Sequence, residues 1–517
     1  MTLTRRALLE HVGAIGGAGA AYAAMELLGL AIPTPAGAEA FQLPRVPGAR
    51  SVVVLGAGIA GLVAAYELQR AGYRVTVIEA ADRIGGRVWT IRGGHRVVQT
   101  GRPDQRAEFA PGLYFDAGAA RIPSTHRVML GYARRFGVAM ETFVNTDRSA
   151  RWDFGGKVEA ERRMVADMRG RLGELLAKAI DRHALEGLAS PDELTAVREF
   201  LADYADVGKD GVYRPSGSSG YSVEPGGYDR GAVPLTPLGL DELLSVSRQS
   251  PVPYVFENKP NMQPTMLQPV GGMDAIAGAF FNQVKQTVRL STPVTGIRRF
   301  GSRVRIEHRG GMTEADYCVC TIPPPILSAI PNDFSAAKKS ALRSVSYLDS
   351  LKVAFESPRF WEADDSIFGG VAWTDRLNEC VLYPSGGFNQ PRGVIVGAYV
   401  AGWTRADNPD AFARLSFDER FAVARQSIEA LHPGRSRLLG KGLTVGWSQT
   451  PWSSGAAALW PDRRGPEYDE LIRPEGPVAF AGEHLSYLGQ WQEGAALAAH
   501  EALKLVAQQA AGVRSGN

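Results

Sequence analysis

The stretch SVVVLGAGIAGLVAAYELQRAGYRVTVIEAADRIGGR at residues 51–87 decides the fold of this chain. Its opening run of apolar, β-branched residues is typical of a buried parallel strand, and Gly56, Gly58 and Gly61 follow at once as a G-x-G-x-x-G turn. Gly56 permits the tight turn, Gly58 lets the backbone approach a pyrophosphate, and Gly61 lets the next helix lie against the sheet. The first helical turn, which contains Ala60, then directs free N–H groups at the phosphate charge.

The rest of this stretch completes a strand–turn–helix–strand unit. Gly72 ends the helix, a second apolar strand follows at 74–78, and Glu79 stands eighteen residues after Gly61. A carboxylate at this place accepts hydrogen bonds from ribose hydroxyls and disfavours a 2′-phosphate. Because the strands, the helix and the acid are in register, the unit predicts dinucleotide binding rather than an ordinary strand-to-helix turn.

Length and composition limit the classes of protein. A chain of 517 residues with 45% hydrophobic and 21% charged side chains predicts two or three globular domains and a core large enough to enclose a cofactor. The formal net charge is only +3 and no long run of Lys or Arg occurs, so we expect no nucleic-acid partner. Cys318, Cys320 and Cys380 have neither disulfide nor metal-site spacing, so we expect buried thiols and no metal.

Residues 1–40 are expected to lie outside the fold. Arg5 and Arg6 form a twin-arginine pattern, and a Gly/Ala-rich apolar stretch with small-residue cleavage sites follows. This segment resembles a Tat export signal, which implies a periplasmic or secreted protein; the alternative is an N-terminal extension with a chance arginine pair. His11 and Glu26 interrupt the apolar stretch, so no stable membrane span is expected in the mature chain.

Segments at both ends of the chain point to a flavin. Arg83, Gly86 and Arg87 belong to an R-x-G-G-R pattern that resembles the one in FAD-binding amine oxidases, where glycines approach the diphosphate and an arginine neutralises it. Near the C-terminus, Glu483 follows an apolar strand and Trp491 precedes an Ala/Leu-rich helix. This part resembles the last flavin segment of the same family, in which the glutamate reaches the ribityl–phosphate chain and the helix N-terminus faces the flavin ring.

Two further segments resemble the substrate site of L-amino acid oxidases. Arg121 in GAARIP matches the arginine that pairs with the substrate carboxylate, a task that suits a planar and permanently charged guanidinium. Tyr383 in YPS matches the tyrosine whose hydroxyl contacts the same carboxylate. The alternatives are a structural ion pair for Arg121 and an ordinary turn for Tyr383.

The stretch SYLDSLKVAFESPRFW at 346–361 resembles the amine oxidase segment whose lysine holds a water against flavin N5, and Lys352 is the matching residue. A lysine within an apolar strand is costly unless its amine is satisfied, which favours a functional role. The alternative is an edge residue that reaches solvent. Residues 447–460 lie where monoamine oxidases carry the cysteine that bonds the flavin. This chain has no cysteine after Cys380, so FAD is expected to be non-covalent unless another residue type is the attachment point.

The resemblance to the flavin amine oxidase superfamily runs from residue 51 to about 505 and implies an α/β fold class. The implied architecture is a discontinuous Rossmann-like FAD-binding domain with a mixed-sheet α+β substrate domain and an inserted helical region. The implied catalytic residues are Lys352, Arg121, Tyr383 and Trp491. The implied cofactor-binding residues are Gly56, Gly58, Ala60, Gly61, Glu79, Ala80, Arg83, Gly86, Arg87, Gly118, Ala119, Arg121, Val294, Glu483, Trp491 and Gln492.

The domain boundaries follow from the same segments. The FAD-binding domain is expected at 48–90, 262–335 and 465–510, the substrate domain at 91–155 and 336–464, and a helical insert with loops at 156–261. Within the insert, apolar residues from Met164 to Ile180 recur at helical spacing, which predicts a helix with its Met/Leu stripe in the core.

The expected activity is oxidative deamination of L-amino acids, with hydride transfer from Cα to flavin N5. O2 is the expected electron acceptor, and the products are a 2-oxo acid, ammonia and hydrogen peroxide. A primary-amine or polyamine oxidase, an amino acid 2-monooxygenase that forms an amide, and a flavin-binding protein without turnover remain the alternatives. The expected partners are an L-amino acid, as the small-molecule substrate, and O2, and the sequence leaves the side-chain preference and a homodimer open.

Overall fold

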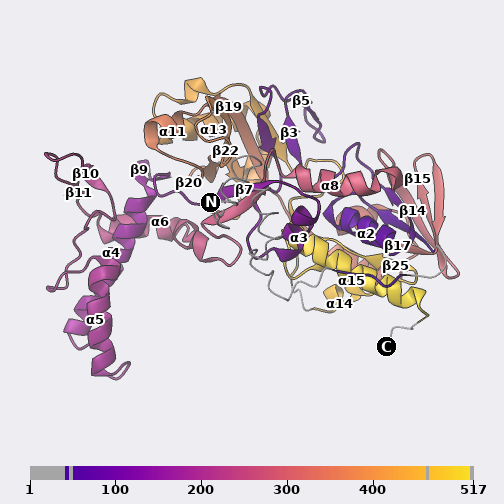
Figure 1. Cartoon of the computed structure of the whole chain (residues 1–517), viewed down its shortest axis with the longest axis horizontal. Coiled ribbons are helices and arrows are strands. Elements are labelled where there is room, and N and C mark those ends of the chain that lie inside the picture. The colour runs from indigo at the N-terminus through magenta and orange to yellow at the C-terminus, as the bar shows by residue number, and fades with distance from the viewer. Residues whose placement is uncertain (1–40, 46–49, 462–464, 513–517) are drawn as a thin grey trace, which may run out of the picture.

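The computed structural model describes residues 41–45, 50–461 and 465–512. Two sheet-based units form the body, and a helical arm projects from one end (Figure 1). The segment that resembles a Tat signal lies outside the described residues. Within the described part of the chain, no helix combines the length and the apolar character that crossing a membrane requires.

The first unit is built on a five-stranded parallel sheet in the order β13-β2-β1-β17-β25. Apolar clusters cover both faces of this sheet, so its strands are apolar at nearly every position. The strands come from widely separated parts of the chain: β1 (Ser51–Leu55), β2 (Arg74–Ile78), β13 (Val288–Arg289), β17 (Tyr317–Cys320) and β25 (Val478–Phe480). The discontinuous Rossmann-like architecture is therefore present.

Three helices pack side by side against one face of this sheet. α2 (Ile59–Arg70) lies between α8 (Asp274–Val284) and α15 (Gln492–Ala510), and Figure 1 shows the three side by side. An antiparallel sheet of β14 (Val294–Phe300), β15 (Arg303–His308) and β16 (Gly311–Ala315) lies at the far end.

The second unit holds a five-stranded sheet in the order β20-β21-β22-β19-β23. Its strands are β20 (Val371–Trp373), β21 (Cys380–Leu382), β22 (Arg392–Val400), β19 (Leu351–Pro358) and β23 (Gly442–Gly446). We expected a mixed sheet; these ladders are antiparallel, and a single parallel bridge joins Asp153 to Thr374 beside the sheet. The helices α11 (Phe360–Asp365), α12 (Asn408–Arg414) and α13 (Phe417–Leu431) cover one face.

Shorter elements connect the units. β7 (Met140–Val144) pairs with β12 (Thr265–Pro269) across the middle of the molecule. Apart from the inserted helices, the remaining helices and strands of the described chain are β3 (Thr90–Arg92), β4 (Arg96–Val97), β5 (Gln105–Arg106), β6 (Tyr114–Asp116), α3 (Arg127–Arg135), β8 (Arg151–Phe154), β9 (Lys157–Ala160), β10 (Tyr221–Val223), β11 (Val233–Pro234), α6 (Leu240–Gln249), α7 (Val252–Val255), η1 (Phe256–Asn258), η2 (Lys285–Thr287), α9 (Pro324–Ala329), α10 (Ala336–Ser344), β18 (Ser346–Leu348), η3 (Ser436–Leu438), β24 (Ala457–Leu459), α14 (Pro466–Ile472) and η4 (Glu483–Leu485).

The inserted helices are present as α4 (Glu161–Asp181) and α5 (Pro191–Ala205). The prediction that their Met/Leu stripe is core is wrong for most of its length. Met164 is buried, but Leu172, Leu175 and Leu176 are exposed. The cause is geometric, because α4 leaves the body after its first turns and then packs only one face against α5.

Candidate functional site

A cavity of about 560 Å³ runs from the first sheet into the second unit. The β1–α2 turn and the end of β2 line one part of it, and Lys352 of β19 with Tyr399 of β22 line another. Because the carboxyl ends of parallel strands open toward the cavity, the site lies where doubly wound sheets usually bind ligands.

The glycine turn is shaped for a close ligand. Gly56 has φ +104°, and a Cβ on Gly61 would lie 1.9 Å from the Gly56 carbonyl oxygen, so neither position tolerates a side chain. Gly58 differs, because it lines the cavity and a Cβ there would meet no protein atom within 4 Å. Protein packing therefore does not require Gly58, and its missing side chain leaves space in the cavity for a bound group.

Glu79 is held at the same end of the cavity. Its carboxylate accepts hydrogen bonds from the backbone N–H groups of Ala57 at 2.6 Å and Ala81 at 2.8 Å. Burial raises the pKa of Glu79, and these N–H groups oppose that rise. Ala80 and Val294 line the adjoining wall, so the nucleotide end predicted from the sequence is assembled in one place.

Two arginines follow the glycine turn and have different surroundings. The Arg87 guanidinium forms an ion pair with Glu483 at 2.8 Å. The Arg83 guanidinium lies 4.2 Å from the centroid of a Trp89 ring and donates to the Gly86 carbonyl, and it has no ion pair within the described residues. Burial lowers the pKa of Arg83 to about 10. Arg83 is thus the arginine whose charge remains available for an anion.

The segment from Glu483 to Gln492 forms the wall of the cavity beside Arg87. Burial alone would raise the pKa of Glu483, but Arg87 and the backbone N–H of Gln490 hold it below its usual value. Trp491 and Gln492 line the cavity at the start of α15. The side-chain oxygen of Gln492 is buried and has no hydrogen-bond partner among the residues that the structure describes. A buried polar atom of this kind needs a partner, and a group bound in the cavity would supply one.

Lys352 lies in a central strand, since β22 and β23 flank β19 on its two sides. The alternative of an edge residue that reaches solvent is therefore wrong. Its Nζ is buried and donates to the carbonyl oxygens of Asp116 at 3.0 Å and Gly118 at 2.7 Å. Burial lowers the pKa of Lys352 to about 7, although Asp116 opposes this shift. Gly118 and Ala119 line the cavity beside the amine.

Arg121 lies on the cavity wall with its side chain buried. Its guanidinium lies 5.7, 5.7 and 5.8 Å from the ring centroids of Phe143, Phe256 and Trp403, and Nη2 approaches the Met262 sulfur at 3.5 Å. No carboxylate pairs with it anywhere in the described ranges, so the structural ion pair is not found. Burial lowers the pKa of Arg121. A buried cation without an anion is costly, so an anionic group bound in the cavity would stabilise the Arg121 guanidinium.

Tyr383 does not reach this cavity, which corrects its predicted place beside Arg121. Its hydroxyl is 2.7 Å from His432 Nε2, and His432 Nδ1 is 2.6 Å from Asp365. Successive residues of a strand point to opposite faces. Leu382 faces the cluster that contains Phe256, whereas Tyr383 faces the helix-covered core.

Tyr399 occupies the place that Tyr383 was expected to take. Register pairs it directly with Lys352, so both side chains lie on one face of the sheet. The Tyr399 ring centroid is 4.7 Å from Lys352 Nζ, and Tyr399 lines the cavity near Arg121. Burial raises the pKa of Tyr399, so the phenol is neutral and can donate. The sequence holds no local signal for Tyr399, because only the pairing of β19 with β22 reveals it.

Aromatic side chains complete the walls. Trp491 packs edge-to-face against His126 with ring centroids 5.0 Å apart. Phe256, Met262 and Trp403 also line the cavity and were not predicted from the sequence. Phe256 begins η1, whereas Met262 and Trp403 lie in loops, and tertiary packing decides the position of all three. Few polar groups are thus left around the Arg121 and Lys352 side chains.

The structure shows the state of the three cysteines and the grouping of side chains that could bind a metal ion. Cys318, Cys320 and Cys380 are free and buried, as expected. The part of the chain that the structure describes contains no cluster of three or more His, Cys, Asp or Glu residues suited to a metal ion.

A parallel sheet whose glycine turn opens into a cavity with a buried lysine and arginine defines the class of dinucleotide-binding oxidoreductases. The chain belongs to the family described as flavin containing amine oxidoreductase, which residues 59–506 match. Residues 14–92 also match the family described as pyridine nucleotide-disulphide oxidoreductase.

Known proteins of this kind are similar over nearly the whole chain. An L-amino-acid oxidase of Siganus canaliculatus is 30% identical over 466 residues, covering 88% of this chain and 84% of the relative. A flavin-dependent L-tryptophan oxidase of Lentzea aerocolonigenes is 27% identical over 491 residues, covering 89% and 98%. The structure of a cyclohexylamine oxidase from Brevibacterium oxydans is similar with a TM-score of 0.62 at 17% identity, covering 89% and 99%. The last similarity concerns the fold alone.

Proposed function

We propose that this flavoenzyme is an FAD-dependent L-amino acid oxidase. The observation that carries the proposal is the buried Arg121, a cation with no acidic partner within the described residues, on the wall of the cavity that Lys352 and Tyr399 also line. A substrate carboxylate would supply the missing anion. Relatives named L-amino-acid oxidase support this choice.

The described residues fit FAD as the flavin. Glu79 would accept from a ribose, the glycine turn and Arg83 would hold the diphosphate, Val294 would contact the adenine, and Gln492 with the start of α15 would meet the ring. Ala456 and Ala457 line the cavity, and no cysteine follows Cys380, so the cofactor would be held without a covalent bond. The chemistry that FAD supplies when bound is acceptance of a hydride from Cα and delivery of two electrons to O2.

The chain's own side chains bind and orient the substrate. The Arg121 guanidinium and the Tyr399 hydroxyl would hold the carboxylate at two points, which limits rotation of the substrate Cα. Trp491, Trp403 and Phe256 would exclude bulk water from the reacting carbon. Lys352 would position a water molecule with the part of its amine that Asp116 and Gly118 leave free. No side-chain base is required if the substrate amine enters neutral.

The overall reaction balances without another reagent. The amino acid loses the Cα–H bond with its electron pair and one N–H proton, which gives an imino acid. Water converts the imino acid to a 2-oxo acid and ammonia, and O2 takes up two electrons and two protons to form hydrogen peroxide.

The rival activities differ in their products. An amine or polyamine oxidase would form peroxide and an aldehyde, a 2-monooxygenase would form an amide, and a flavin-binding protein would form nothing. The purified protein should be tested with the twenty L-amino acids and their decarboxylated amines, with peroxide and organic products measured. Peroxide and a 2-oxo acid from amino acids alone support the proposal, whereas aldehyde or amide as the main product contradicts it.

Export through the Tat-like segment also belongs to this proposal. Arg5→Lys with Arg6→Lys should keep the enzyme in the cytoplasm if the pair is an export signal. Fractionation of cells that express both forms would show whether the enzyme leaves the cytoplasm only when the pair is intact.

A further inference from the structure

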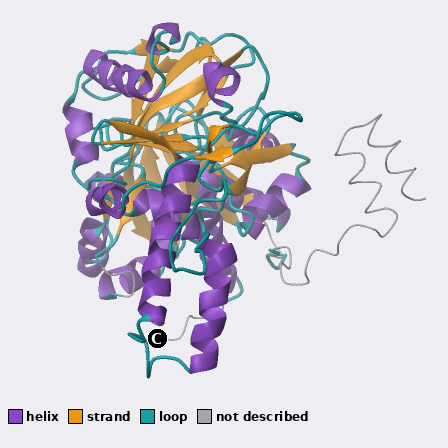
Figure 2. Cartoon of the chain, turned by 90° about the vertical axis from the view of Figure 1, so that its left-hand side faces the viewer, coloured by secondary structure: helices purple, strands orange, loops and turns teal. Residues whose placement is uncertain are grey.

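A buried carboxylate lies behind one wall of the cavity, outside the set of residues that line it. Glu379 is fully buried and directly precedes β21, in the turn that follows β20. Both strands belong to the second sheet, whose strands are orange in the upper part of Figure 2 and are joined by teal loops. The described residues supply no cation to pair with this carboxylate. Because a buried charge is costly unless its hydrogen bonds are satisfied, the groups that it binds indicate its role.

The carboxylate of Glu379 holds both ends of one loop. This loop is 401–407, between β22 and α12. Oε2 accepts from the backbone N–H of Ala401 at 2.8 Å and from that of Trp403 at 3.1 Å. Oε1 accepts from Nδ2 of Asn408, the first residue of α12, at 3.1 Å. The carboxylate thus gives neutral donors from the start of the loop to its end a common acceptor.

The backbone of Glu379 shows that its side chain has a task. Its φ is +58°, in the left-handed region that residues other than glycine rarely adopt. Its carbonyl oxygen accepts from the N–H of Thr374 at 2.8 Å, and its own N–H donates to the Arg376 carbonyl at 3.0 Å, so the turn is closed on both sides. A glycine would adopt this conformation freely. A glutamate persists in it only where the surrounding structure over-determines it, and here the loop supplies that constraint.

The loop that Glu379 holds forms part of the cavity wall beside Arg121. Residues 401–403 line the cavity. The Trp403 ring centroid is 5.8 Å from the Arg121 guanidinium carbon and 5.0 Å from the Phe256 ring centroid. The position of this loop therefore decides how closely the indole covers the buried cation.

Other contacts of the loop hold different atoms. Residues 405–407 are exposed. The Trp403 ring packs against Trp373 with centroids 5.4 Å apart, and the Trp403 carbonyl oxygen accepts from Ser250 Oγ at 3.1 Å. These contacts hold the indole and one carbonyl group, whereas Glu379 holds N–H groups of the loop. Removal of the carboxylate should therefore loosen the loop without unfolding the sheet.

We infer that Glu379 is a positioning residue that fixes the loop 401–407, so that the Trp403 indole covers the Arg121 guanidinium where the substrate carboxylate binds. The inference rests on the proposed function, because that function brings a carboxylate to Arg121. The indole strengthens this charge pair by keeping water away from it, since a polar surrounding weakens the attraction between charges. Glu379 lies outside the cavity lining and acts only through the loop.

Glu379→Gln in the FAD-bound enzyme tests the inference. Glutamine keeps the length of the side chain, but its NH2 group cannot accept hydrogen bonds from the loop. KM for an L-amino acid should rise about 10-fold and kcat should fall less than about 3-fold, because the change weakens the hold on the carboxylate rather than the chemistry at Cα. The dissociation constant of benzoate, a carboxylate without an oxidisable amine, should rise by a similar factor when it is measured from the flavin absorbance.

A double variant separates positioning from a general structural role. Trp403→Phe should also raise KM, because the smaller ring covers less of the guanidinium. Trp403→Phe combined with Glu379→Gln should be little worse than either single variant, since both changes act on the same contact. A glutamate that is only structural would give increases in KM that multiply.

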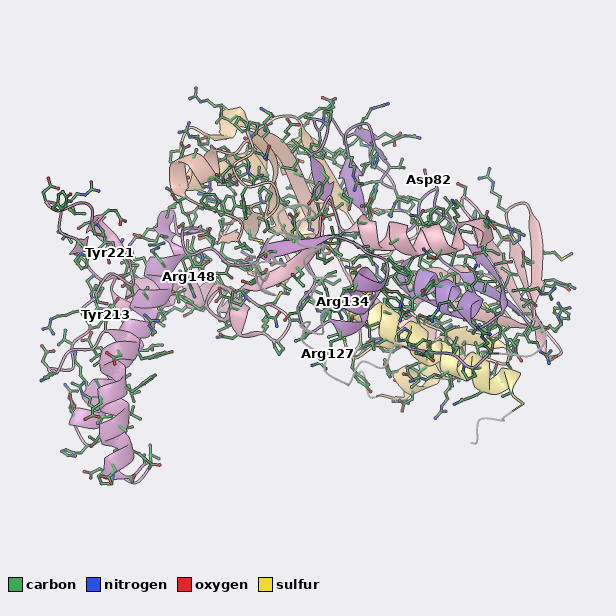
Figure 3. All side chains as sticks on the ribbon, viewed as in Figure 1. Asp82, Arg127, Arg134, Arg148, Tyr213 and Tyr221 are labelled. Carbon is green, nitrogen blue, oxygen red and sulfur yellow. The ribbon has the colours of Figure 1, made fainter. Side chains whose placement is uncertain are left out.

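Trypsin measures the order of the loop without turnover. Arg405 is exposed within the loop, and cleavage after it should be at least about 3-fold faster in Glu379→Gln, because proteolysis follows the population of opened states. Arg134 is an exposed residue of α3, labelled in Figure 3, and cleavage after it is the internal reference. Its rate should stay constant.

Glu429→Gln is the matched control. Glu429 also accepts from backbone N–H groups of a loop, those of Gly434 at 2.7 Å and Ser436 at 3.2 Å, but none of these three residues lines the cavity. This variant should keep the wild-type KM, the wild-type affinity for benzoate and the wild-type rate of cleavage after Arg405.

If Glu379→Gln does not fold, Asn408→Ala provides the same comparison, because it removes the donor to Oε1 and leaves the carboxylate in place. KM should then rise about 3-fold, as expected for one lost hydrogen bond. A folded variant with the wild-type KM and benzoate affinity would overturn the inference, and so would multiplying effects in the double variant. A wild type that oxidises amines but no L-amino acid would refute the proposed function and the role at Arg121 together, and faster cleavage alone would then make Glu379 a structural residue.

Discussion

Replacement of Arg121 by methionine should separate oxidation of amino acids from oxidation of amines. In the cavity the guanidinium is buried against Phe143, Phe256 and Trp403, with no acidic partner in the described part of the chain. The substrate carboxylate would therefore be its only strong anion. Methionine has a similar length and an apolar surface that suits these rings.

The expected magnitude follows from the burial of this charge. Truncating one partner of a buried, hydrogen-bonded charge pair costs about 2–5 kcal/mol, because the other charge is left unpaired. At about 1.4 kcal/mol for each factor of ten, kcat/KM for a good L-amino acid should fall at least ~30-fold. The free energy of unfolding should rise or stay constant, since the variant no longer buries an unpaired charge.

Peroxide formation measured with one L-amino acid and with its decarboxylated amine gives the comparison. Arg121→Met should lose most of its activity on the acid, while activity on the amine changes little or rises. Damage to the flavin site would lower both rates equally. Arg127→Met, on the exposed side of α3, is the matched control and should leave both rates unchanged. Equal losses on acid and amine, or no loss on either, would refute the role of Arg121 and favour the amine oxidase alternative.

Four further measurements address the cofactor and the residues Lys352, Tyr399 and Tyr383. Acid precipitation should release yellow flavin into the supernatant, because no cysteine follows Cys380; flavin retained on the pellet would contradict a non-covalent site. Lys352→Met should fold and bind FAD but slow flavin reduction or reoxidation in stopped-flow experiments, and unchanged rates would make the lysine structural. The pKa of Lys352 is about 7 in the fold against 10.5 in its ordinary state, so the folded chain holds fewer protons between these values. Wild-type stability should therefore rise from pH 7 to pH 10 relative to Lys352→Met in urea unfolding, and the absence of that rise would argue against burial of the amine. Tyr399→Phe should raise KM for L-amino acids, whereas Tyr383→Phe should not, and the reverse result would restore the original assignment of Tyr383.

The nucleotide end of the cavity could be predicted because its parts are close in sequence. The glycine turn, Glu79 and the two arginines lie within residues 51–87, and strand and helix geometry alone brings them together. Lys352 and Arg121 were also found in the cavity, since each belongs to a recognisable segment. Their surroundings could not be predicted, because the residues that shield them from solvent are distant in the sequence. Examples are Phe143 of β7, Phe256 of η1 and Tyr399 of β22.

The predicted place of Tyr383 and the predicted burial of α4 were wrong for the same reason, because both depend on long-range contacts. A tyrosine in a strand faces one side or the other according to alternation, and only the pairing of β19 with β22 shows that Tyr399 lies beside Lys352. In the same way, the apolar spacing of α4 correctly indicated a helix. It did not show whether the body of the protein covers that face, because this depends on the direction in which the helix leaves the sheets.

By itself, the sequence of this protein determined the parallel nucleotide-binding unit, the flavin family and the residues at the nucleotide end of the cavity, because local spacing and residue chemistry carry that information. Only the tertiary structure decided that Arg121 has no counter-ion in the described residues, that Lys352 is in a central strand, that Tyr399 replaces Tyr383 at the cavity, and that much of the apolar stripe of α4 is exposed. Each of these depends on which distant segments become neighbours, and the physical reason is that strand register and helix direction arise from packing of the whole chain.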